Sequence, residues 1–259
     1  MDLVSFLAGV VTLAAAFLVL PISMALVEKR RQRNLEDALF SPDPEVRGEA
    51  RDRLSQMRVE SASFAFALLR NGDVQTKLDI APLFLEKRGA LGEAAVDALG
   101  CVACEGDEYQ RQSALMYLLL APRRSQSIVK PLTERLPIEP VLRVRIDTML
   151  LLATMAKEGS PDDLDSSLRT DVVKAVVGVI GSDSDEARAC ATACLLPNGP
   201  LAPFIAGAEV TLMALLRSPR QDVVDWTARV ILAHRKTLKH AMSCIPASRA
   251  SADLVDLVG

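Results

Sequence analysis

The chain has 259 residues, of which 50% are hydrophobic and 24% are charged, and its formal net charge at pH 7 is -3. This composition excludes a disordered or collagen-like chain, because neither carries enough apolar residues to form a core. Aromatic residues make up only 4%, and Leu, Ala, Val and Arg dominate, which favours helices over a barrel or sandwich. The sequence predicts an ordered, all-α protein.

The first 28 residues predict a transmembrane helix. Residues 3–27 carry no charged side chain, and at about 1.5 Å per residue they would cross a hydrocarbon core of about 30 Å with some tilt. A secretory signal peptide is the alternative, but only Met1 and Asp2 precede the apolar run, so the positive n-region is missing. The run is also long for a signal peptide. We therefore expect a membrane anchor over residues 1–28.

Small residues within this predicted helix could let another membrane helix approach closely. Ser5 and Gly9 form a small-xxx-small pair, and Ala8 and Thr12 continue a second stripe. The other interpretation is that such residues are simply common in membrane segments. The sequence leaves both open.

A basic cluster over residues 29–34 predicts the orientation in the membrane. Its residues are Lys29, Arg30, Arg31 and Arg33. By the positive-inside rule everything after the anchor is cytoplasmic and the N-terminus lies outside, which we expect in a bacterial inner membrane. The five cysteines, an odd number at irregular spacing, agree with a reducing compartment. The cluster could also hold the following helices near an anionic leaflet.

Residues 35–245 predict repeated helix pairs, because apolar residues recur every three or four positions and turn residues interrupt them. The first turn covers residues 41–44, and a polar loop is predicted over residues 159–165. Comparable points recur at intervals of 29, 35, 32, 45 and 35 residues, which is the range of solenoid repeats. These points lie near Glu45, Val74, Tyr109, Val141, Glu186 and Gln221.

The segment LEDALFSPDPEVRGEARDRL resembles the consensus of HEAT-type repeats, and later copies resemble it in part. The resemblance implies an α-solenoid of about five to six helix pairs that exposes a face for a protein partner. Asp43, Pro44 and Arg47 match the turn of the motif, and in the family the Asp and Arg help join neighbouring repeats. The sequence leaves open whether the tail over residues 246–259 folds over the last apolar seam or stays mobile.

No catalytic, cofactor or metal site is predicted. Cys101 and Cys104 form a Cys-x-x-Cys, but a closed zinc site needs a second matching pair of ligands. Cys190 and Cys194 are one helical turn apart and could present two sulfurs, or could be small core residues. The remaining candidates, which form no second pair, are Cys244, His234 and His240.

The sequence therefore predicts a membrane-anchored cytoplasmic scaffold that binds protein and is not an enzyme. An accessory subunit of a larger membrane complex, held through its transmembrane helix, is the alternative. A HEAT-like nucleic-acid enzyme is a third possibility, but the acidic balance of residues 35–259 argues against phosphate binding. A local basic strip remains open for that function, formed by Arg111, Arg123, Arg124, Arg143 and Arg145.

Overall fold

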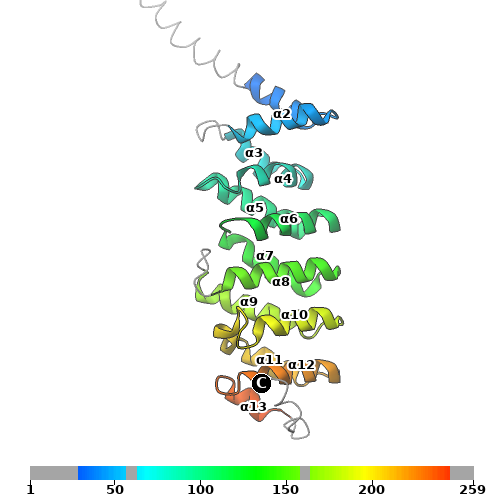
Figure 1. The fold of residues 1–259 in the computed structure, drawn as a ribbon, viewed down its shortest axis with the longest axis vertical. Helices are drawn as coiled ribbons and strands as arrows, with labels where there is room; N and C mark the ends of the chain where they lie inside the picture. Colours follow the sequence, from blue (N-terminus) through cyan, green and yellow to red (C-terminus); the bar gives the residue numbers. More distant parts are fainter. Residues whose placement is uncertain (1–28, 57–62, 158–163, 246–259) are drawn as a thin grey trace, which may run out of the picture. The chain divides into compact units, whose positions relative to one another are not determined.

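The computed structural model describes residues 29–56, 63–157 and 164–245, which form helices and loops and no strand (Figure 1). The chain divides into two compact units, residues 1–65 and 66–259. Residues 29–39 are helical. The α-helices that follow are α2 (Pro44–Ser55), α3 (Ser63–Asn71), α4 (Val74–Ile80), α5 (Ala90–Glu105), α6 (Glu108–Leu120), α7 (Val129–Arg135), α8 (Leu142–Ala156), α9 (Ser166–Val179), α10 (Asp185–Leu195), α11 (Glu209–Leu215), α12 (Gln221–Ala233) and α13 (Lys239–Ser243). The prediction of an all-α helical-repeat protein is confirmed.

Several predictions fall on residues that the structure does not describe. The predicted transmembrane helix, with Ser5, Ala8, Gly9 and Thr12, lies outside the described residues, as do residues 159–163 of the predicted polar loop and the tail over residues 246–259. Among the helices that are described, none combines the length and the apolar character that a bilayer crossing requires. The basic cluster lies on the helical segment 29–39 with its four cations exposed.

The first unit contains the predicted turn. Asp43 caps α2, its Oδ1 accepting the backbone N–H of Glu45 at 2.9 Å, and Pro44 occupies the first helical position, where a missing N–H costs nothing. Nη1 of Arg47 donates to the carbonyls of Ser41 (2.6 Å) and Pro42 (2.8 Å). Asp43, Pro44 and Arg47 therefore act together to fix one turn.

Each pair consists of a first helix, a short turn and a second helix, and the second helices share one register. In α6, α8, α10 and α12, the residues seven and eleven positions after the N-cap are small or aliphatic and buried. Positions four residues apart lie on the same side of a helix, so each second helix turns one stripe toward the core. These residues are Ala114 and Leu118, Thr148 and Leu152, Ala191 and Leu195, and Thr227 and Ile231.

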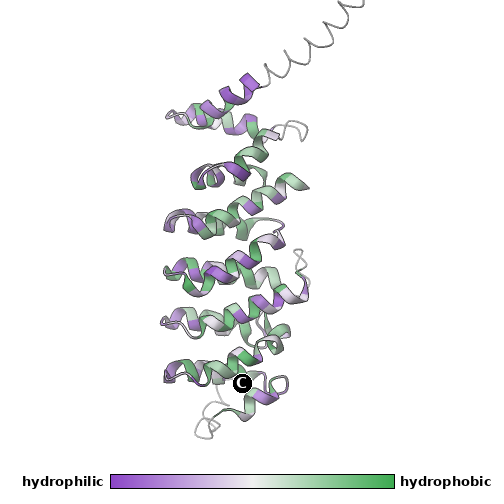
Figure 2. Ribbon diagram, turned by 180° about the vertical axis from the view of Figure 1, so that it is seen from behind, coloured by the Kyte–Doolittle hydropathy of each residue, from purple (hydrophilic) through white to green (hydrophobic). Residues whose placement is uncertain are grey.

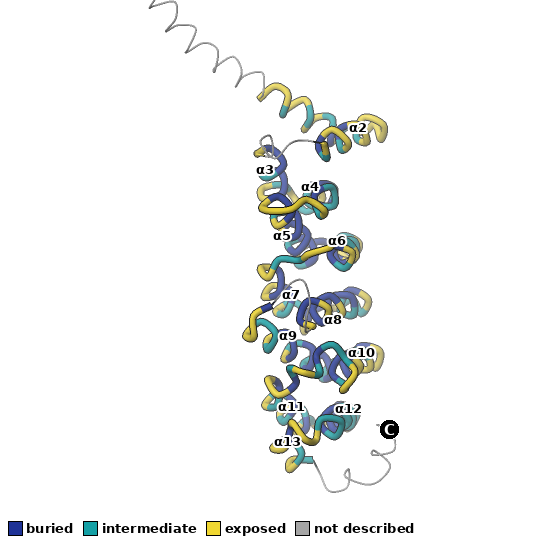
Figure 3. Tube along the Cα trace, turned by 60° about the vertical axis from the view of Figure 1, so that its left-hand side comes forward, coloured by how far each residue is buried: buried dark blue, intermediate teal, exposed yellow. Residues whose placement is uncertain are grey.

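In the second unit the helices form two columns (Figures 1 and 3). The first helices α5, α7, α9 and α11 contact one another in sequence, and the second helices α6, α8, α10 and α12 do the same. Prolines shorten two of the first helices: Pro137 lies in the 3-10 helix η4 (Leu136–Ile138) and Pro203 in η5 (Ala202–Ala208). Two more 3-10 helices are η2 (Ala81–Phe84) and η3 (Gln126–Ile128).

The turns between first and second helices gather along one edge of the second unit, where Figure 2 shows mostly hydrophilic residues. An arginine four residues after the N-cap recurs there and donates to carbonyls of its own turn. Arg111 bonds Gly106, Arg145 bonds Glu139, and Arg188 bonds Ser182. A turn leaves carbonyls without helical partners, and these guanidinium groups satisfy them.

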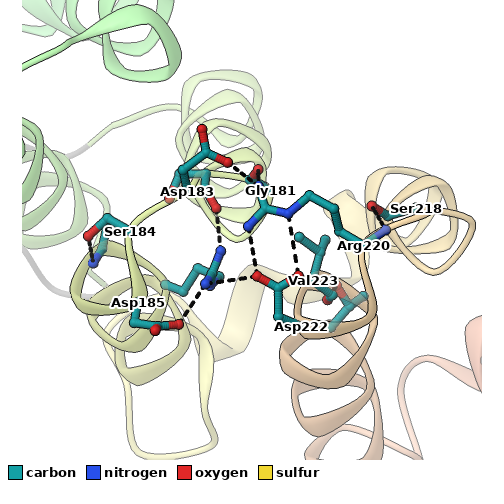
Figure 4. Close-up of polar contacts among 12 residues, drawn as sticks. Gly181, Asp183, Ser184, Asp185, Ser218, Arg220, Asp222 and Val223 are labelled. Atoms are coloured by element: carbon teal, nitrogen blue, oxygen red, sulfur yellow. Dashed lines mark hydrogen bonds and ion pairs between the residues drawn. The ribbon is translucent and has the colours of Figure 1, made fainter.

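Side chains at the same edge join consecutive pairs. Glu139, whose side chain is 1% exposed, accepts from Arg111 (2.9 Å) and Arg135 (3.2 Å). Between α10 and α12, Arg188 pairs with Asp222 (2.9 Å) and Arg220 pairs with Asp183 (Figure 4). Charge therefore links the α5–α6 pair to the α7–α8 pair, and the α9–α10 pair to the α11–α12 pair, in addition to the apolar core.

Candidate partner-binding surface

The second helices expose an equivalent row of side chains in each repeat. The positions two, five, nine and thirteen residues after the N-cap lie opposite the buried stripe, and on α6, α8 and α10 they are exposed or half-buried. We call this row the second-helix face. It comprises Tyr109, Gln112, Met116 and Leu120 on α6; Arg143, Ile146, Leu150 and Thr154 on α8; Glu186, Ala189, Ala193 and Pro197, the last just beyond α10; and Asp222, Asp225, Arg229 and Ala233 on α12.

Large apolar side chains concentrate at the α6 and α8 part of this face. Tyr109 is 74% exposed, Met116 53%, Leu120 75% and Leu150 40%. Ala189 and Ala193 continue the apolar surface on α10, which contacts α8. A single exposed leucine needs no explanation, but a contiguous apolar group on neighbouring helices is typical of a surface that another protein covers.

The α12 end of the face is more polar. The guanidinium carbon of Arg229 lies 4.7 Å from the ring centroid of Trp226, a cation–π arrangement. Asp222 and Asp225 lie on the same helix, and Asp222 is held by Arg220 and Arg188. The face therefore passes from an apolar part on α6 and α8 to a charged part on α12.

A cleft of about 800 Å³ adjoins the apolar end of the face. It lies where the loop before α5 approaches the loop after α6, and Leu120 contributes to both the cleft and the face. Its charged lining residues are Glu86, Lys87, Arg88, Glu93, Arg123 and Arg124. The cleft thus holds four cations and two carboxylates.

The predicted Cys-x-x-Cys lies in the last turn of α5 rather than in a knuckle. Cys101 accepts from Lys77 Nζ (3.3 Å) and donates to Glu105 Oε2 (3.2 Å). Burial raises the pKa of the Cys101 thiol, and burial raises that of Cys104 to about 11. Both are therefore protonated at neutral pH. A second, smaller cleft of about 300 Å³ adjoins Cys101 and Lys77.

The second pair of cysteines faces a different environment. Cys190 and Cys194 lie on α10, and the hydrogen bond between their thiols lowers the pKa of Cys190 to about 7 and raises that of Cys194. Within the described residues no group of three His, Cys, Asp or Glu is placed to hold a metal ion. His234 Nε2 lies 2.6 Å from the carbonyl of Leu195, and His240 is exposed.

The arginines of the predicted basic strip do not form a continuous surface. Arg111 is buried against Glu139, Arg124 bonds the carbonyls of Leu118 and Leu119, and Arg143 pairs with Asp147. Arg145 bonds its own turn. Arg123 lines the cleft, and it forms no ion pair or side-chain hydrogen bond with the described part of the chain.

No protein-family model and no curated protein sequence matches the chain. Among solved structures, a designed armadillo repeat protein is similar, with 17% sequence identity over 82% of this chain and 99% of that chain and a TM-score of 0.40. At this score the likeness adds nothing to the repeat organisation that the helices themselves show.

Sequence reasoning missed both the second-helix face and the cleft. The face could have been found, because its residues recur at fixed offsets from turns that the sequence does reveal. The cleft could not, because Lys87 and Arg123 are 36 positions apart in the sequence and come together only when α6 packs against α5.

Proposed function

We propose that the chain is a HEAT-type scaffold that binds a protein partner along the second-helix face. The observation that carries the proposal is the exposed apolar group of Met116, Leu120 and Leu150 on the neighbouring helices α6 and α8. Burying such side chains against a partner releases about 25 cal/mol per Å² of apolar surface. The expected role is binding rather than catalysis.

The rest of the proposal concerns the membrane. Residues 3–27 would anchor the scaffold as a single-pass helix with the N-terminus outside and the repeats in the cytoplasm of a bacterial inner membrane. Confinement to the membrane surface would raise the effective concentration of a bound partner beside membrane proteins.

The test compares partners that copurify with the tagged full chain and with defined variants, identified by mass spectrometry after gentle detergent extraction. Met116→Glu combined with Leu150→Glu places two charges on the apolar part of the face. Val210→Glu is the matched control, because Val210 is 81% exposed on α11, a first helix away from that face. We expect the double variant to lose a partner that the wild type and the control retain.

A chain lacking residues 1–28 separates the scaffold from the alternative, an accessory subunit of a membrane complex. A partner that follows both the full and shortened chains binds the repeats. Membrane proteins that follow only the full chain would support the accessory subunit, and Gly9→Leu should then release them by widening the helix contact at the small-residue stripe. Retention of every partner by the double variant would contradict binding along the face.

A further inference from the structure

We infer that the cleft beside Leu120 binds an acidic segment of the protein partner, next to apolar partner residues that lie on the second-helix face. The inference rests on the proposed function, since it names the chemistry of the partner at one end of that face. It is carried by the juxtaposition of a cationic cleft with an exposed apolar helix surface.

The charge of the cleft differs from that of the chain. The chain has a net charge of -3, whereas the cleft lining carries four cations and two carboxylates, which makes +2 locally. Lys87, Arg88 and Arg123 are exposed, and none of them forms an ion pair or side-chain hydrogen bond with the part of the chain that the structure describes. Cations left unpaired in a concave surface favour an anionic occupant.

The fourth cation has a structural role that keeps the cleft in place. Arg124 donates from Nε to the carbonyl of Leu118 (2.8 Å) and from Nη2 to that of Leu119 (2.8 Å). These bonds fix the loop after α6 to the end of that helix, so Arg123 is held at the rim beside Leu120. The position of the cation relative to the apolar face is thereby set.

The opposite wall is a tight loop that exposes backbone to the cleft. Gly89 has a φ of 79°, a conformation that favours glycine, and a Cβ on Gly92 would lie 2.0 Å from the carbonyl oxygen of Lys87. Gly89 is also the N-cap of α5 and offers no side chain to its first turn. The first turn of α5 therefore has no side-chain cap from its N-cap residue at the wall of the cleft that carries Lys87 and Arg88.

A polypeptide fits this surface better than a small free anion does. The cleft measures about 800 Å³, which exceeds what one phosphate or carboxylate needs, and it contains the apolar residues Leu85, Val96 and Leu120. The apolar surface extends from Leu120 to Met116, one helical turn earlier on α6. An occupant that matches both parts has carboxylates beside apolar side chains, as an acidic segment with aliphatic residues does.

The experiment selects peptides of random sequence, displayed on phage, for binding to the full chain. We expect the selected peptides to combine Asp or Glu with aliphatic residues. Affinities of the selected peptides are then measured by fluorescence anisotropy for wild type and for Arg88→Glu with Arg123→Glu. Each reversed cation should weaken binding at least about fivefold, and raising the salt from about 50 mM to about 500 mM should weaken it further.

Two controls make the result decisive. Arg235→Glu with Lys236→Glu reverses two exposed cations beyond α12 and should leave the affinity unchanged, and melting temperatures confirm that each variant is folded. Inorganic phosphate at about 10 mM should compete no better than chloride of equal ionic strength; specific competition would identify a free-anion site and overturn the inference.

The two levels of the proposal fail differently. If the cleft variants bind like wild type while Met116→Glu with Leu150→Glu does not, the inference is wrong and the face stands. If the selected peptides lack acidic residues, the inference is also wrong. If the face variant and the cleft variant both bind like wild type, both the inference and the proposed function are wrong.

Discussion

Arg188 on α10 and Asp222 on α12 join two consecutive helix pairs, with 2.9 Å between Nη2 and Oδ2. The arginine side chain is 4% exposed and also bonds Asp185 (2.6 Å), while Asp222 also accepts from Arg220 (2.7 Å). The two repeats therefore share one network of alternating charges rather than a single bridge.

Acidification should weaken this junction. Hydrogen bonds from Arg220, and the positive charge of Arg188, hold the pKa of Asp222 below its usual value of 3.8. A group with a lowered native pKa stabilises the fold above its unfolded pKa and loses that contribution as pH falls through the native pKa. We expect the urea concentration at the unfolding midpoint of the full chain to decrease as the pH is lowered below about 4. Asp222→Asn should make this decrease less steep.

Glu186→Gln is the control for this experiment. It removes a carboxylate from the same helix pair, and Glu186 forms no ion pair with Arg188 or Arg220. It should keep the wild-type acid dependence. An Asp222→Asn chain with the same dependence as wild type would show that the pair contributes nothing to stability.

Glu139 should be the most sensitive carboxylate at the turn edge. Glu139→Gln removes the charge that Arg111 and Arg135 share and leaves a buried guanidinium without its counter-ion. We expect the free energy of unfolding to fall by about 3 kcal/mol, against less than about 1 kcal/mol for Glu49→Gln at an exposed pair with Arg53. Urea titration followed by circular dichroism measures both, and equal losses would contradict the buried network.

Two helical glycines should respond in opposite directions to alanine. A Cβ on Gly100 would lie 2.5 Å from Cγ2 of Ile128, so Gly100→Ala should lower the free energy of unfolding by about 1 to 3 kcal/mol. A Cβ on Gly178 meets nothing within 4 Å, so Gly178→Ala should raise it by about 0.5 to 1 kcal/mol. Stabilisation by Gly100→Ala would disprove the close packing of α5 on η3.

Cys190 should be the most reactive partly buried thiol near neutral pH. Its pKa of about 7 depends on the hydrogen bond from Cys194. Cys194→Ala removes that bond, so alkylation of Cys190 by iodoacetamide should slow about tenfold near pH 7. Mass spectrometry of the labelled peptides measures this, with exposed Cys244 as internal reference; an unchanged rate would rule out the thiol pair.

The second helices could be predicted from sequence because turn residues mark where each begins. The expected points near Val74, Tyr109 and Glu186 lie within one residue of the starts of α4, α6 and α10. The signal is local, since an N-cap and the following apolar period are contained in one segment. Whether the five arginines form a basic strip could not be decided from the sequence, because not all of their contacts are local. Arg111 meets Glu139 only across two pairs, and nothing in either segment alone shows that contact.

The short first helices α7 and α11 could not be predicted from the sequence pattern either. Pro137 and Pro203 divert the adjoining segments into 3-10 turns, which lack the 3.6-residue period that marks an α-helix. The cleft required the packing of α6 against α5 as well as the helix boundaries.

The turn before α12 lacks an arginine of its own at the repeated position, where Val224 stands four residues after the N-cap. Arg220 reaches back instead to Asp183 and to the carbonyl of Gly181 in the preceding turn. The arginine of the turn before α12 therefore bonds a carbonyl of the preceding turn instead of one in its own. The two ends of this junction are therefore not equivalent: removing the turn before α10 would leave Arg220 without two of its partners, whereas the turn before α10 would keep the bond from Arg188 to Ser182 without α12.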